Sequence, residues 1–215
     1  MQTPPRLTPD AALFLDFDGT LVALAETPEA IEVPPALVAL LTDLHELLGG
    51  ALAIVSGRQI DAIDRFIAAL RLPAAGEHGV QRRDAEGHMQ EQRAPDLEAV
   101  CREAMVRVLD GQPQLELLHG KFVFEVKPAG INKGIAIDAF MREAPFAGRV
   151  PVFAGDDTTD ETGFAVVQPR GGVAIKVGSG PTQALHRLDS TLAVYEWLLE
   201  ARDLLANGPR QEAQP

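Results

Sequence analysis

Two carboxylates that stand two positions apart define the first site of possible chemistry in this sequence. Asp16 and Asp18 follow the apolar run at residues 11–15, and Gly19 comes directly after them. Neighbouring carboxylates are costly in a folded protein unless a cation or a phosphoryl group uses them. A carboxylate at Asp16 can attack phosphorus and form an aspartyl-phosphate, and Asp18 can protonate the leaving oxygen and later activate water. The alternative is a simple turn, because Asp and Gly are common turn residues.

Two further clusters supply groups that bind anions. Ser56 offers a hydroxyl and Arg58 a positive charge, with Gly57 between them, directly after the apolar run at residues 51–55. Lys133 lies at the start of a predicted helix, where its charge and the free backbone N–H groups favour anions. Each cluster has a plain alternative, because Ser-Gly-Arg is also a turn sequence and a lone lysine is usually solvated.

The fourth cluster is acidic and suits a metal ion. Asp156, Asp157 and Asp160 follow the apolar run at residues 149–154. Their oxygens suit Mg²⁺, a hard ion that prefers one or two carboxylates together with water and phosphate oxygens. Without a cation, these acids beside Asp16 would repel one another strongly. The alternative is that the acidic run begins a helix and complements its dipole.

The elements expected around these clusters alternate between strand and helix. Short apolar runs predict buried strands at residues 11–15, 51–55, 149–154 and 172–177. Apolar residues at helical spacing predict helices that begin near Pro35, near Ile60 and just after Lys133, with helical segments between residues 185 and 205. This alternation is typical of a parallel α/β sheet, in which ligands bind at the carboxyl ends of the strands. The polar clusters fall at those ends.

The pattern changes in the middle of the chain and becomes antiparallel in character. Hairpins are expected where residues 80–83 pair with 88–92, and where residues 115–118 pair with 122–126. An amphipathic helix is expected between them, at residues 97–109. The sequence therefore predicts a core made of residues 1–78 and 128–215, with an inserted α+β cap at residues 79–127.

Composition limits the class of protein. The chain has 215 residues and a net charge of −12 at pH 7, which argues against nucleic acid or an anionic membrane as a general partner. The single cysteine, Cys101, excludes a disulfide framework and a thiolate zinc cluster. No apolar run approaches the roughly 20 residues of a membrane span, and the N-terminus lacks a basic-then-apolar signal pattern. We expect a cytoplasmic monomer whose partner is a small molecule.

In this order, the clusters resemble the four motifs of the haloacid dehalogenase superfamily of phosphotransferases. Within that superfamily, the sequence is similar to the trehalose-6-phosphate phosphatases. The similarity runs from about Leu13 to Leu199 and is densest from Phe122 to Pro181. The segments that carry it are Asp16 to Thr20, Ser56 to Arg58, Glu77 to Gly79, Glu125 to Pro128, Asn132 to Gly134, and Gly155 to Glu161.

The resemblance implies a fold and a reaction. The fold is a Rossmann-like core with a parallel sheet and an inserted cap. The reaction is Mg²⁺-dependent hydrolysis of trehalose 6-phosphate to trehalose through an aspartyl-phosphate. The implied catalytic residues are the nucleophile Asp16, the acid and base Asp18, and the phosphoryl-binding Ser56 and Lys133. The implied metal-binding residues are Asp16, Asp18 (through its backbone carbonyl), Asp156 and Asp157.

The resemblance also implies contacts with the substrate. The phosphoryl group would lie against the loop of Asp16, Phe17, Asp18, Gly19 and Thr20, with Gly57 and Arg58 beside it. Glu125 and Lys127 stand two apart on a predicted strand, so their side chains share one face. Such a charged pair can bind sugar hydroxyls through strong hydrogen bonds, and its alternative is a cross-strand ion pair.

One departure from the family concerns the cap. Members of the family usually carry an additional strand with a His-Tyr-Arg run before Ala-Pro, whereas here Arg93-Ala94-Pro95 has no His-Tyr before it. The segment between Pro73 and Lys127 is therefore expected to be shorter than usual. The phosphoryl chemistry does not depend on this segment, but the choice of sugar does.

Other functions remain open at this point. A related phosphatase could act on sucrose 6-phosphate or mannosyl-3-phosphoglycerate, and a substrate panel would separate these. A phosphomutase would give an isomeric phosphate in place of free phosphate. A non-catalytic phosphosugar-binding regulator would be expected to have lost Asp16 or Asp18, and both are present.

Overall fold

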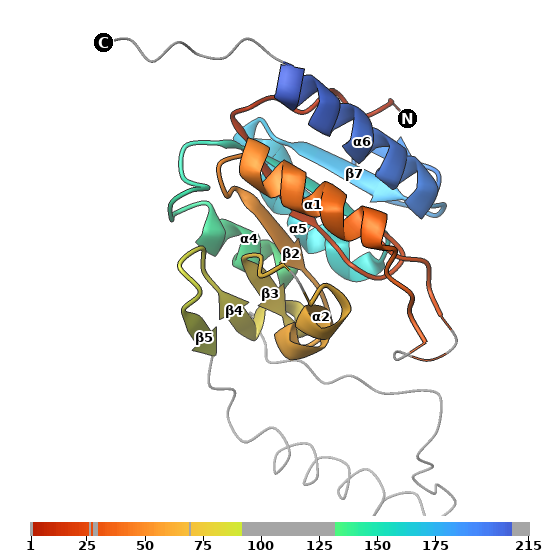
Figure 1. Ribbon diagram of the computed structural model, residues 1–215. Coiled ribbons are helices and arrows are strands. Elements are labelled where there is room, and N and C mark those ends of the chain that lie inside the picture. The colour runs from red at the N-terminus through yellow and green to blue at the C-terminus, as the bar shows by residue number, and fades with distance from the viewer. Residues whose placement is uncertain (1, 26, 28–29, 69, 92–131, 208–215) are drawn as a thin grey trace, which may run out of the picture.

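A computed structural model describes residues 2–25, 27, 30–68, 70–91 and 132–207. These residues form an eight-stranded sheet with helices on both faces (Figure 1). β1 (Ala11–Leu15) is central and runs parallel to β2 (Leu52–Val55) on one side and β6 (Val150–Gly155) on the other. The strand order is β5-β4-β3-β2-β1-β6-β7-β8. The predicted α/β class and the predicted strands around the clusters are confirmed.

The remaining elements complete both halves of the sheet and both helical layers. The other parallel strands are β3 (Ala74–Gly76), β7 (Val173–Val177) and β8 (His186–Leu188), and the antiparallel strands are β4 (Gln81–Arg83) and β5 (Met89–Glu91). The α-helices are α1 (Pro35–Leu47), α2 (Ile60–Phe66), α4 (Lys133–Phe140), α5 (Glu161–Val167) and α6 (Thr191–Asn207). Short 3₁₀ turns are η1 (Glu77–Gly79), η2 (Thr158–Asp160) and η3 (Gln168–Arg170).

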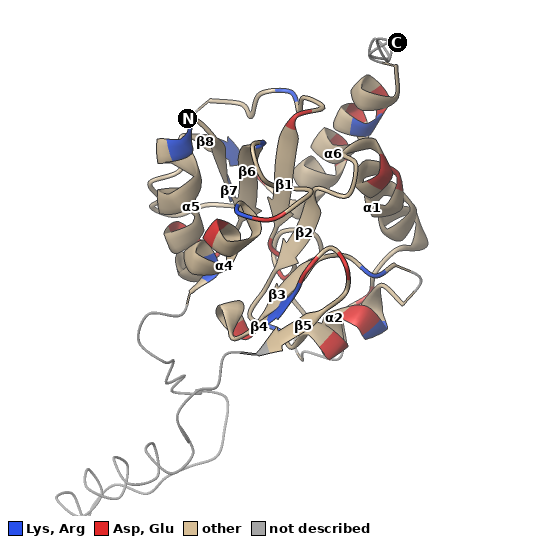
Figure 2. Ribbon diagram, turned by 90° about the vertical axis from the view of Figure 1, so that its left-hand side faces the viewer, with Lys and Arg blue, Asp and Glu red and all other residues tan. Residues whose placement is uncertain are grey.

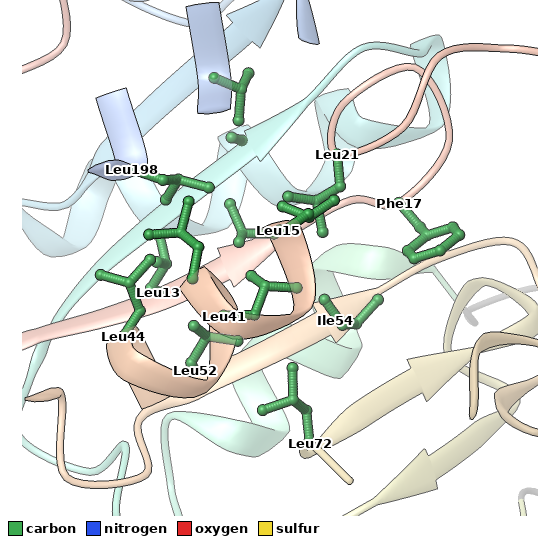
Figure 3. Close-up of a cluster of buried hydrophobic side chains, with 14 of the residues drawn as sticks. Leu13, Leu15, Phe17, Leu21, Leu41, Leu44, Leu52, Ile54, Leu72 and Leu198 are labelled. Atoms are coloured by element: carbon green, nitrogen blue, oxygen red, sulfur yellow. The ribbon is translucent and has the colours of Figure 1, made fainter. Parts of the chain in front are cut away.

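The central strand β1 is buried on both faces because a helical layer covers each. Leu13 and Leu15 pack into the cluster under α1 and α6, where Leu41 and Leu198 lie (Figure 3). The alternate side chains, such as Phe14, pack into a second cluster under α4 and α5. Successive side chains of a strand point to opposite faces, so a run that is apolar at every position requires two covered faces. This burial fixes the end of β1, and hence the place of the residues after it.

Helix α1 follows from its sequence pattern. Pro35 is its first residue, a position at which the missing N–H costs no hydrogen bond. Its buried face consists of Leu37, Leu40, Leu41 and Leu44. Gly49 and Gly50 follow with φ values of 57° and 86°, a backbone conformation in which glycine commonly ends a helix. The predicted helix is therefore confirmed at both ends.

Two strands and one helix end differ from the sequence-based expectations. β3 was not predicted, and β8 falls in a segment expected to be helical. The apolar spacing that predicts the helix near Ile60 continues through Ile67 and Leu70, but α2 ends at Phe66. β3 and β8 each have three residues, too few to show a period, and pairing with longer neighbours stabilises them.

The expected hairpin at residues 80–83 and 88–92 is present, but it extends the core sheet. β4 pairs with β3, with Ala74 opposite Arg83, and β5 pairs with β4. The first part of the range 79–127 therefore belongs to the sheet of the core and not to a separate unit. Residues 92–131, including the expected helix at 97–109 and the second hairpin, lie outside the described residues. The division into core and cap stays a prediction.

The ribbon is blue along part of β4, where Lys and Arg are coloured (Figure 2). The two neighbouring arginines of this strand, Arg82 and Arg83, contact both helical layers. Arg83 donates two hydrogen bonds of 2.7 Å to Asp64 on α2. Arg82 donates two of 2.7 Å to Glu143, in the turn after α4. Both arginines are buried, and each paired guanidinium forms the two-fold contact that makes such ion pairs strong. Ion pairs thus connect β4, next to the edge strand β5, to elements on both faces of the sheet.

Within the described part of the chain, no helix combines the length and the apolar composition needed to cross a membrane.

Candidate active site

The backbone pairing between β1 and β6 continues into the first residue of the loop after β1. The N–H of Asp16 donates to the Ala154 carbonyl at 2.9 Å, which continues the ladder with β6. The N–H of Leu21 donates to the Phe17 carbonyl at 3.0 Å and closes the turn. The side chains of Phe17 and Thr20 are fully buried. Contacts of these two residues with a substrate, as predicted, would therefore come from their backbone groups.

Gly19 allows Asp156 to approach this loop. Its φ is +72°, and a Cβ at this position would lie 2.0 Å from Oδ2 of Asp156. Side chains are disfavoured by that backbone conformation, and none fits beside the carboxylate. The glycine therefore permits the carboxylate after β6 to sit against the loop after β1.

Lys133 joins two carboxylates at the floor of the site. Its Nζ donates to Oδ1 of Asp16 and to Oδ1 of Asp160, each at 2.6 Å. The side chains are 3%, 5% and 0% exposed, respectively. Lys133 is the first residue of α4, and the helix is capped by Asn132, whose side chain accepts from the N–H of Ile135 at 3.0 Å. The predicted helix start is confirmed, and it directs the ammonium group at Asp16.

Burial and mutual repulsion dominate the electrostatics of this cluster. Burial raises the pKa of Asp16 well above its usual range, although Lys133 opposes the rise. The pKa of Asp156 is also raised, by burial and by the charge of Asp160. Burial alone would lower the pKa of Lys133, but Asp16 and Asp160 raise it above its ordinary value. The lysine is therefore charged, but its single charge does not offset the burial and mutual repulsion that raise the pKa values of Asp16 and Asp156.

The acidic cluster fits a divalent cation. One carboxylate oxygen each from Asp16, Asp156 and Asp160 lies within 4.8 Å of the others. Oxygen ligands at such spacing suit Mg²⁺, whose charge would offset the repulsion that raises the pKa values of Asp16 and Asp156. Lys176, which is buried, donates to the backbone carbonyl of Asp156 and so helps to fix that residue.

The structure brings Asp160 into this cluster in place of the predicted Asp157. The side chain of Asp157 caps η2, and that of Asp160 accepts from the Asp157 N–H at 2.8 Å. Burial acts to raise the pKa of Asp157, but hydrogen bonds from the backbone N–H of Thr158 and from Thr159 lower it below the usual value. The alternative of a capped helix start is thus realised together with the acidic cluster. A metal-binding role for Asp157 stays a prediction.

Ser56 and Arg58 lie where β2 ends. The hydroxyl of Ser56 is buried and accepts from the N–H of Arg58 at 3.2 Å. Arg58 donates to both carboxylate oxygens of Asp18, at 2.6 Å and 2.8 Å. Its guanidinium also lies 5.2 Å from the centre of the Phe66 ring, a cation–π contact. The predicted acid and base is therefore held by an arginine that sequence reasoning had placed beside the substrate.

These residues surround one hollow, with a volume of about 410 Å³. Its wall contains the predicted residues Asp16, Asp18, Ser56, Gly57, Arg58, Lys133, Asp156 and Asp157, together with Leu24, His78 and Thr159. Residues separated by more than a hundred positions thus meet at one end of the sheet, as strand ends of a parallel sheet do.

Three residues of this region were not in the predicted site. Asp160 was grouped with the acidic run whose oxygens suit Mg²⁺ but was not among the implied metal-binding residues, and its spacing from Asp157 fits a capping box. His78 was assigned no role, although Glu77-His78-Gly79 belongs to the segments that carry the family resemblance. Lys176 gave no signal beyond its place at the end of a strand. Glu125 and Lys127 lie outside the described residues, and their contact with a sugar stays a prediction.

Comparison with known families gives a specific match. The profile of the trehalose-phosphatase family matches residues 14–105 and 91–192. A trehalose-6-phosphate phosphatase from Escherichia coli is 38% identical over 234 positions, which cover 90% of this chain and 87% of the relative. The two profile segments overlap at residues 91–105, so the match is interrupted inside the range where the sequence is expected to be short.

Solved structures agree on the fold. A trehalose-6-phosphate phosphatase related protein superimposes with a TM-score of 0.67 at 24% identity, covering 89% of this chain and 97% of the other. A phosphatase of the haloalkanoate (HAD) superfamily from Bacteroides thetaiotaomicron superimposes with a TM-score of 0.62 at 15% identity, covering 90% and 94%. At these identities the likeness concerns the fold alone, and it is the fold that the four motifs predict.

Proposed function

The chain belongs to the trehalose-phosphatase family of phosphoric monoester hydrolases, and we propose that it hydrolyses trehalose 6-phosphate to trehalose and phosphate through an aspartyl-phosphate on Asp16. The observation that carries the proposal is the contact of Lys133 with Asp16 at 2.6 Å on the floor of the pocket. It keeps a buried carboxylate oriented, and a nucleophile must meet its target in a fixed geometry.

Asp16 acts as the nucleophile in the first half of the reaction. The carboxylate oxygen of Asp16 that does not bind Lys133 attacks phosphorus, and the bond between phosphorus and the sugar oxygen breaks. Asp18 donates a proton to that oxygen, and trehalose leaves. General acid assistance of this kind typically contributes about 10²–10⁴-fold to a rate.

Water completes the second half of the reaction. Asp18, now a carboxylate, accepts a proton from water as the water oxygen attacks phosphorus. The bond from phosphorus to Asp16 breaks, so that free phosphate forms and the Asp16 carboxylate is regenerated. The two-fold contact between Arg58 and Asp18 occupies both oxygens of that carboxylate and fixes its orientation. Arg58 must loosen this hold before Asp18 can reach the leaving oxygen.

The remaining groups bind the phosphoryl group and balance its charge. Lys133 and the Ser56 hydroxyl supply hydrogen-bond donors from two different strand or helix ends. Asp16 and Asp156, with the backbone carbonyl of Asp18, would hold Mg²⁺, whose bound form supplies positive charge against the acids and the phosphate. Asp160 binds Lys133, so we assign it the orientation of the lysine.

A substrate panel tests this function. Phosphate release is measured from trehalose 6-phosphate, sucrose 6-phosphate, glucose 6-phosphate and p-nitrophenyl phosphate, with Mg²⁺ and after its removal by chelation. The proposal predicts a Mg²⁺-dependent preference for trehalose 6-phosphate, which Asp16→Asn abolishes without unfolding the protein. Hydrolysis of the aryl phosphate alone would keep the chemistry and reject the substrate. Binding of sugar phosphates without hydrolysis would favour a regulator.

A further inference from the structure

The turn at Glu77 and His78 has an unusual backbone. Their φ values are 48° and 59°, and they are the non-glycine residues with positive φ in the described part of the chain. Histidine is among the side chains that tolerate this region, but the conformation still costs free energy. Such a backbone persists only where the surroundings hold it, and it is often found at binding sites.

Hydrogen bonds fix this turn to the loop after β2. The N–H of Glu77 donates to the Arg58 carbonyl at 2.9 Å, and the N–H of His78 donates to the Ser56 carbonyl at 3.0 Å. The side chain of Gln59 donates to the Glu77 carboxylate at 3.1 Å. The two loops therefore form one unit, and His78 has a defined place beside the residues that bind the phosphoryl group.

The imidazole of His78 lies directly on Gly57. A Cβ at Gly57 would be 2.8 Å from both Cε1 and Nε2 of the ring, which no side chain could tolerate without displacing the ring. The ring also forms part of the pocket wall. The glycine and the strained turn thus act together to place an imidazole against the pocket.

The pocket wall is not confined to the residues assigned to the phosphoryl group. Leu24, His78 and Thr159 also line the hollow, whose volume is about 410 Å³. Nδ1 of His78 is buried, so Nε2 is the ring nitrogen that can reach a ligand. Nε2 of a neutral imidazole is a donor or an acceptor according to the tautomer, and a sugar hydroxyl can pair with either form. On the basis of the proposed function, we propose that His78 contacts the sugar of the substrate and so contributes to the preference for a sugar phosphate.

Two substitutions of His78 separate this role from a structural one. His78→Asn keeps a side chain that tolerates positive φ, and His78→Gly removes the backbone cost, so both variants are expected to fold. We expect kcat/KM for trehalose 6-phosphate to fall about tenfold in each, as for the loss of one hydrogen bond to substrate. The loss on p-nitrophenyl phosphate should be much smaller, because that substrate has no sugar. His88→Asn, at an exposed histidine after β4, is the matched control.

Each outcome decides between the interpretations. Equal losses on both substrates would overturn the sugar contact and make His78 a residue that positions the Ser56 loop. Unchanged kinetics on both substrates would also overturn it. If the wild-type enzyme shows no preference for trehalose 6-phosphate over the aryl phosphate, the proposed function fails and the inference fails with it. If the wild-type enzyme prefers trehalose 6-phosphate and both His78 variants keep that preference, the inference about His78 fails while the proposed function stands.

Discussion

Replacement of Lys133 by methionine should destabilise the metal-free protein severely. The substitution removes an ammonium group that is 3% exposed and leaves Asp16 and Asp160, 5% and 0% exposed, without their cation. Two charge-assisted hydrogen bonds of 2.6 Å are lost, and each contributes about 1.5–3 kcal/mol. Breaking a buried pair by removing one partner costs about 3–5 kcal/mol, which we take as the expected loss in the free energy of unfolding.

The loss should depend on pH. The folded-state pKa values of Asp16 and Asp156 are raised mainly by burial. The contribution of these two groups to stability is therefore most favourable below the unfolded carboxyl pKa and decreases as pH rises through the folded values. Without Lys133, the carboxylates take up protons more readily, and at acid pH these protons replace the lost charge. The difference between variant and wild type should therefore be smaller at pH 5 than at pH 8.

Urea unfolding followed by circular dichroism, in the presence of a chelator, measures both effects. An expected loss of about 4 kcal/mol corresponds to roughly 10 °C in Tm for a protein of this size. Arg142→Met is the control, because Arg142 forms an exposed pair with Asp138 that should contribute less than about 1 kcal/mol. A loss below about 1 kcal/mol for Lys133→Met, or a loss equal at both pH values, would refute the electrostatic reasoning.

Two further substitutions test the scaffold and the acidic cluster. Asp64→Ala should lower the free energy of unfolding by about 2–3 kcal/mol, because it leaves the buried Arg83 without its two-fold partner. Hydrogen bonds and charge from Arg83 outweigh the effect of burial and lower the pKa of Asp64. This contribution should therefore be present above the usual carboxyl pKa and disappear as pH falls through the folded value, which urea titrations at several pH values can follow. Gly19→Ala should displace Asp156, whose Oδ2 lies 2.0 Å from the new Cβ, and weaken Mg²⁺ binding in calorimetry at least about tenfold. Gly87→Ala, at another positive φ with open space around it, should leave Mg²⁺ binding unchanged, and equal effects of the two would contradict the proposed collision.

The strands that end at the site could be predicted because a strand that is buried on both faces is apolar at nearly every position. β1 is apolar at every position, and the prolines and glycines around α1 bound that helix. β3 has the sequence Ala-Ala-Gly, which has no strand preference of its own, so its pairing with β2 makes it a strand. The antiparallel pairing of β3 with β4 contributes in the same way. The hairpin of β4 and β5 could be predicted from its turn, but its attachment to β3 depends on tertiary contacts.

The same limit applies within the site. The types and order of Asp16, Ser56 and Lys133 indicated phosphoryl chemistry, because each stands at the end of a predicted element. The contact between Lys133 and Asp16 joins residues far apart in the chain, and no local pattern encodes it. The choice of Asp160 over Asp157 as the carboxylate beside Asp16 depends on which of the two caps η2, and the sequence Asp-Asp-Thr-Thr-Asp permits either.

The central claim is that phosphate passes through Asp16, and rapid acid quenching can capture it there. Trehalose 6-phosphate labelled in its phosphate is mixed with enzyme and Mg²⁺, quenched in acid within one turnover, and the chain is digested and mapped. We expect label on the peptide that contains Asp16, appearing before free phosphate and decaying as phosphate is released, with none in Asp16→Asn. Release of phosphate at the normal rate with no label on the wild-type chain, or label retained in Asp16→Asn, would contradict the proposed mechanism.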